Sequence, residues 1–141
     1  MNGNMRKETA EAIAAGERAL SSLRAARDAL NSARNWGILD LLGGGFITDL
    51  IKHSKLDRAA SYVEEAKYAI RCFEQELRDV QIVLDLRGEF GGFLSFADFF
   101  FDGLVADYLV QSRIAEARRQ IEDAIEQVAQ VLGRLRRMYE Y

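Results

Sequence analysis

The stretch that most constrains the fold is residues 46–87, which contain neither glycine nor proline. Apolar residues recur along it at alternating steps of three and four, as in a helix that packs against other helices over its whole length. This seam consists of Leu56, Ala59, Val63, Ala66, Ile70, Phe73, Leu77, Val80 and Leu84. At about 1.5 Å per residue, the pattern predicts one continuous helix on the order of 60 Å long.

A helix is expected on either side of this long one. The first, from about residue 5 to 34, has a narrow apolar face among many alanines, formed by Ile13, Gly16, Leu20, Leu23 and Leu30. The last, from about residue 103 to 139, has a seam of Ile114, Ala117, Ile121, Ala124, Val128, Val131, Leu135 and Met138. The chain has no proline, a residue that costs about 3 kcal/mol inside a helix. The prediction is therefore an all-α protein.

Two apolar, glycine-containing connections separate these helices, and we call them the first elbow (residues 35–45) and the second elbow (residues 89–102). Each glycine costs about 1 kcal/mol in a helix relative to alanine, so the glycine run 43–45 is expected to break the helix. The second elbow holds most of the chain's eight phenylalanines. Their helical spacing predicts a short amphipathic helix that covers one end of the core.

The sequence also contains an internal repeat. With an offset of about 58 residues, Asp40, Gly45 and Asp49 align with Asp98, Gly103 and Asp107. The repeats, approximately 5–62 and 63–119, each read as helix, elbow, helix, with the middle helix shared. We expect residues 1–141 to form one domain, an antiparallel up-down-up three-helix bundle. The alternative is a four-helix bundle, made by a break in the long helix near residues 74–79.

Two aspartates, Asp49 and Asp107, fall on core-facing seam positions just after the elbows. A buried carboxylate without a partner is costly. Arg27 and Arg34 are expected to approach Asp49, and Arg87 is expected to approach Asp107. The favoured interpretation is a structural polar clasp that fixes the register of each hairpin. A metal or small-ligand site at these seam carboxylates, with His53 beside Asp49, is the alternative.

Asp40 and Asp98 precede an apolar run and a glycine in the two elbows, so each is predicted to cap the start of a short helix. Gly45 and Gly103 are expected to allow close backbone contact there. We find no catalytic triad, phosphate loop or zinc-ligand spacing in the sequence. No catalytic residue, metal ligand or cofactor is assigned, and the chain is not expected to be an enzyme.

Net charge and cysteine content limit the kinds of partner and the cellular location that are expected. The net charge is −3 without a clustered cationic face, so a nucleic-acid partner is not expected. One cysteine forms no internal disulfide, and no signal peptide or membrane-spanning segment is visible. These features predict a cytoplasmic protein.

The sequence analysis therefore predicts a non-enzymatic helical interaction or scaffold module. It would self-associate, as a homo-oligomer, or dock a protein partner through the apolar elbows. The expected interaction surface consists of Trp36, Leu39, Leu42, Phe90, Phe93, Phe96, Phe99 and Phe100. A second possibility is that the elbows insert at a membrane surface.

Overall fold

The computed structural model describes residues 3–43, 46–84, 90–103 and 111–140, with side chains for 3–32, 58–81, 90–98 and 116–140. Over these residues the chain is an all-helical bundle of four helices, without strands. The helices are α1 (Gly3–Gly43), α2 (Phe46–Leu84), α3 (Gly91–Gly103) and α4 (Gln111–Glu140). None of the described helices combines the length and apolarity needed to cross a membrane.

The long helix is confirmed, because α2 runs unbroken from Phe46 to Leu84. The break near residues 74–79, proposed as a route to a four-helix bundle, is wrong. The predicted α2 seam is buried from Ala59 to Val80, and the predicted α4 seam is buried from Ala117 to Leu135. Strong apolar periodicity and the absence of a breaker explain why these two helices were predicted well.

The first elbow is shorter than predicted, because α1 continues to Gly43. Residues 35–42 contain one isolated glycine, Gly37, among apolar residues. A single glycine costs about 1 kcal/mol in a helix and is often tolerated. Only the glycine run that follows coincides with the end of α1. In the second elbow, the predicted short helix is confirmed as α3.

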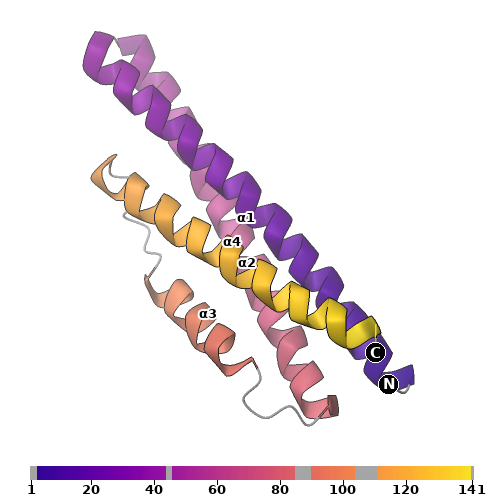
Figure 1. Ribbon diagram of the computed structural model, residues 1–141. Coiled ribbons are helices and arrows are strands. Elements are labelled where there is room, and N and C mark those ends of the chain that lie inside the picture. The colour runs from indigo at the N-terminus through magenta and orange to yellow at the C-terminus, as the bar shows by residue number, and fades with distance from the viewer. Residues whose placement is uncertain (1–2, 44–45, 85–89, 104–110, 141) are drawn as a thin grey trace.

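Figure 1 shows α1 and α2 as a long hairpin, with α4 beside α1 and with α3 beside the later part of α2. α1 packs against α2 and α4, and α3 packs against the same two helices, so the contacts run round a ring. One buried cluster includes residues from all four helices. α3 is much shorter than the other three helices, so it lies along only part of the length of α2 and α4.

Two polar contacts fix the direction of α4. Arg118 donates a hydrogen bond to Asn31 through Nη1 at 3.2 Å, and Arg136 forms an ion pair with Glu17 at 3.1 Å. Later residues of α4 thus meet earlier residues of α1, so the two helices are antiparallel. In the predicted up-down-up order the first and last helices would be parallel. Between α2 and α4 the chain also contains α3, a helix that the three-helix prediction counted as part of the second elbow.

The predicted apolar face of α1 is confirmed at Gly16, Leu23 and Leu30, which are buried, but not at Ile13 and Leu20. The buried residues are Ala12, Ala15, Ala19, Leu23, Ala26 and Leu30, whereas Ile13 and Leu20 are only partly buried. At Gly16 the packing is tighter still, because an added Cβ would lie 2.6 Å from Leu132 Cδ2 and 2.9 Å from the Phe73 ring. Small residues therefore allow α1 to approach both α2 and α4 closely.

Candidate functional site

Many predicted site residues lie outside the described side chains. These are Trp36, Leu39, Leu42, Arg34, Asp40, Gly45, Asp49, His53, Arg87, Phe99, Phe100, Gly103 and Asp107. The predicted clasps between arginine and aspartate therefore remain predictions, as does the alternative metal site at Asp49. The internal repeat also stays a prediction.

Arg27, the one clasp residue with a described side chain, is not on the core-facing seam. Ala26 occupies that position and is fully buried, whereas Arg27 is half-buried at the edge. Its Nε donates to Asp28 Oδ1 at 3.2 Å. An exposed pair of this kind contributes about 0–1 kcal/mol. Arg27 therefore lies at the edge of the buried α1 face, and its predicted contact with Asp49 stays a prediction.

The two predicted caps are not at helix starts. Asp40 lies within α1, and Asp98 lies within α3, where it is exposed. Phe90 directly precedes α3, and its backbone carbonyl accepts the first helical hydrogen bond, from the Leu94 N–H at 2.9 Å. The Phe90 N–H donates in turn to Gln81 Oε1 at 3.2 Å. The start of α3 is thus tied to the end of α2.

The phenylalanines at the start of α3 whose side chains are described pack into the core. Phe90 and Phe93 are 1% and 4% exposed, and Phe96 packs against the same cluster. The ring centroids of Phe73 and Phe93 are 5.3 Å apart, with an angle of 59° between the planes. Phe90 and Phe93 were therefore wrongly included in the interaction surface, and they are not available for membrane insertion.

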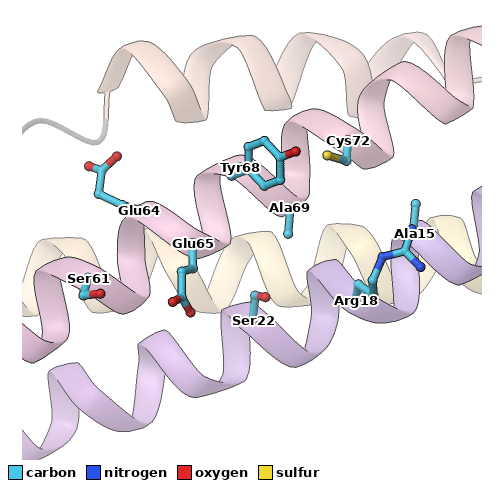
Figure 2. Close-up of a pocket in the computed structure, with 9 residues that line it drawn as sticks. All are labelled: Ala15, Arg18, Ser22, Ser61, Glu64, Glu65, Tyr68, Ala69 and Cys72. Carbon is cyan, nitrogen blue, oxygen red and sulfur yellow. The ribbon is translucent and has the colours of Figure 1, made fainter.

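The surface of the α1–α2 hairpin carries a different feature, a hollow of about 730 Å³. Its wall is mostly apolar. Figure 2 shows the lining residues, which come from α1 and α2 alone. They are Ala15, Arg18, Ser22, Ser61, Glu64, Glu65, Tyr68, Ala69 and Cys72. Small side chains line its floor, because α1 and α2 approach closely there.

A second hollow, of about 330 Å³, lies along the same face. It is lined by Ala25, Asp28, Ala29, Ser32, Arg58 and Tyr62. On α1 the lining residues of the two hollows follow one another at steps of three and four, and the same holds on α2, so they share one face of each helix. We call the two hollows together the furrow.

Two aromatic side chains stand beside the furrow. Tyr68 is 72% exposed and Tyr62 is 36% exposed, and these are the exposed large hydrophobic side chains in the described part of the chain. Hydrogen bonding to Cys72 is the largest cause that raises the pKa of Tyr68 above its ordinary value of 10.0. Tyr68 is therefore a neutral phenol at physiological pH, with an apolar ring and a polar tip.

Charged side chains of both signs line the furrow. Figure 2 shows Glu65 leaning from α2 toward α1 near Ser22, with Arg18 farther along. Arg58 borders the second hollow. Beyond Arg18 and Cys72, the same helix faces continue to a cluster of carboxylates, in which oxygens of Glu8, Glu76 and Asp79 lie within 4.8 Å of one another.

Within this acidic cluster, Glu76 has an unfavourable environment for a charged carboxylate. Its Oε2 is enclosed and accepts no hydrogen bond from the described residues. Burial is the largest cause that raises its pKa, and the neighbouring Glu11, Asp79 and Glu8 carboxylates raise it further. Arg18 lowers it, but the net direction is upward. The acidic end of the furrow is thus short of positive charge.

Neither the furrow nor the acidic cluster was predicted from the sequence. The usable signal was a run of alanine and serine on one face of α1, opposite serine, alanine and cysteine on α2. No protein-family model matches this chain, and comparisons with curated proteins and with solved structures find no match.

Proposed function

We propose that this chain is a non-enzymatic helical interaction module whose furrow receives a helix from a second polypeptide. The observation that supports it most directly is a mostly apolar furrow of small residues, bordered by Tyr62 and Tyr68. Helices commonly bind in apolar grooves of this kind. Exposed tyrosines suit the role, because they bury a large ring at an interface and keep a polar tip.

The proposal keeps the function expected from the sequence and changes its location. The described phenylalanines of the second elbow are occupied in the core, whereas the furrow lies on the outside of the α1–α2 hairpin. We take the four helices as a single four-helix bundle, in which the outer face of this hairpin is available for docking.

Photo-crosslinking tests the proposal. A benzophenone amino acid is introduced at Tyr68, beside the furrow, and at the exposed Ser95 on α3 as the matched control. We expect ultraviolet light to produce discrete adducts from position 68 and none from position 95. Mass spectrometry then identifies the crosslinked polypeptide, whether a copy of this chain or another protein. Equal yields from both positions, or none from position 68, would refute the proposal.

A further inference from the structure

The furrow leads at one end into the acidic cluster. On α1, Glu8 and Glu11 precede the lining residue Ala15 at steps of three and four, so they continue the same helix face. On α2, Glu76 and Asp79 follow the last lining residue in the same way. Glu11 raises the pKa of Glu76, as Glu8 and Asp79 do, so the four carboxylates are close neighbours. Acidic groups from both helices therefore lie together at one end of the furrow.

The negative charge at this end is not neutralised within the described part of the chain. Elsewhere beside the furrow, Glu64 forms an ion pair with Lys67 at 3.8 Å, and Asp28 forms one with Arg27 at 3.2 Å. Among the described side chains, none forms an ion pair with these four carboxylates. Arg18 is close enough to counter their mutual repulsion in part, but it is a single cation. The acidic end thus attracts positive charge from outside the chain.

The opposite end of the furrow differs in charge. Arg58 borders the second hollow, where the acidic lining residue Asp28 is already paired with Arg27. Along α2, Arg58 and Glu76 are separated by about five helical turns, or about 27 Å. A helix that lies in the furrow therefore meets negative charge at one end and positive charge at the other.

We infer that the occupant of the furrow is an amphipathic helix of another polypeptide, with lysine or arginine at one end of its apolar face. The floor of small residues receives the apolar face, and the basic end lies over the acidic cluster. Its cations bind the partly exposed Glu8 and Asp79 carboxylates, whereas the enclosed Oε2 of Glu76 acts through its charge alone. Glu76 follows Tyr68 by about two turns, so these cations lie about 12 Å along the helix from the level of Tyr68.

This inference rests on the proposed function, and two synthetic peptides test it separately. Both are helical, span the furrow and share an apolar face of alanine and leucine; one carries three arginines at one end, and the other carries three glutamates there. Fluorescence anisotropy measures their affinities for the wild-type protein. We expect the arginine peptide to bind about tenfold more tightly. The preference should shrink at high salt, because salt screens exposed charges.

Neutralisation of the acidic end locates this preference. The variant combines Glu8→Gln, Glu11→Gln and Asp79→Asn, and it should bind the two peptides with similar affinity. The matched control removes the same charge from exposed positions on α4, with Glu122→Gln, Asp123→Asn and Glu126→Gln, and should keep the preference. Circular dichroism verifies that each variant is helical. The peptide comparison on the wild type remains decisive if a variant fails to fold.

Three results would overturn the inference: equal affinities of the wild type for the two peptides, tighter binding of the glutamate peptide, or no binding of either. A preference that survives in the neutralised variant would overturn it as well. Photo-crosslinks from position 68 to a copy of this chain, or to a segment without lysine and arginine, would also contradict it and would leave the broader proposed function standing. Without any crosslink from position 68, the proposed function fails too.

Discussion

At the scale of single residues, Glu76 makes the stability of the bundle depend on pH. Its carboxyl has a pKa raised above the ordinary value of 4.5, chiefly by burial and then by three neighbouring acids. The folded state therefore holds the Glu76 proton more tightly than the unfolded state does. The resulting stabilisation is complete below about pH 4.5 and is lost as the pH rises through the folded-state pKa.

We predict that Glu76→Gln stabilises the protein at pH 7, because it removes an ionised carboxylate from an enclosed acidic site. The gain should shrink as the pH falls toward 4.5, where wild-type Glu76 becomes protonated. Urea unfolding at several pH values and low protein concentration measures this difference. Glu122→Gln, at an exposed position on α4, is the control and should show little change. A loss of stability in Glu76→Gln at pH 7 would contradict the electrostatic account.

At the scale of helices, Gly16 sets how closely α1, α2 and α4 pack. A methyl group at this position would meet Leu132 and Phe73 at distances below 3.0 Å. We predict that Gly16→Ala destabilises the protein by about 1–3 kcal/mol, the usual range for overpacking, although alanine favours the helix. Chemical denaturation measures the change in the free energy of unfolding.

Gly133 provides a matched control for this substitution. It also lies inside a helix, but a Cβ there would meet only Arg137 Nη1, at an ordinary contact distance of 3.6 Å. Gly133→Ala should therefore stabilise the protein by about 0.5–1 kcal/mol through helix propensity. If the two substitutions shift stability by the same amount in the same direction, close packing at Gly16 is not the controlling factor.

The attachment of α3 depends on Phe93, which packs between the Phe73 and Phe96 rings. We predict that Phe93→Ala costs about 3–5 kcal/mol, the range for removing a buried aromatic side chain. Ser95→Ala, two residues along the same helix and exposed, should change stability by less than about 0.5 kcal/mol. Thermal unfolding followed by circular dichroism compares them. Similar melting temperatures for the two variants would show that α3 contributes little to the core.

At the scale of the whole molecule, the long seams were the predictable part. On α2 and α4, large apolar residues and charged faces alternate without interruption, so periodicity identified the buried positions. On α1 the same reasoning selected Ile13 and Leu20, because large apolar residues usually fill a core. The structure buries Ala12, Ala15 and Ala19 instead. Where helices pack closely, the smallest side chains are the buried ones. A prediction from hydrophobic periodicity gives alanine too little weight to find them.

The furrow could not be predicted for a related reason. Its floor is made of alanine and serine and its edges carry charges, so each helix alone resembles an ordinary solvated face. It becomes a recognisable site only when α1 and α2 are aligned, since the hollows and the charge order depend on their relative register. That register is a tertiary property, set by the close packing of the two helices.

The most direct test of the account uses Cys72, the chain's single cysteine, which is half-buried in the furrow wall. The rate of its alkylation by a maleimide is measured over a range of concentrations of the polypeptide that crosslinks to position 68, alongside a Cys72→Ser, Ser95→Cys control. If a helix of that polypeptide covers the furrow, Cys72 alkylation slows as the polypeptide binds, while the control rate stays constant. A Cys72 rate that is unchanged at saturating concentrations of the polypeptide would contradict the central claim.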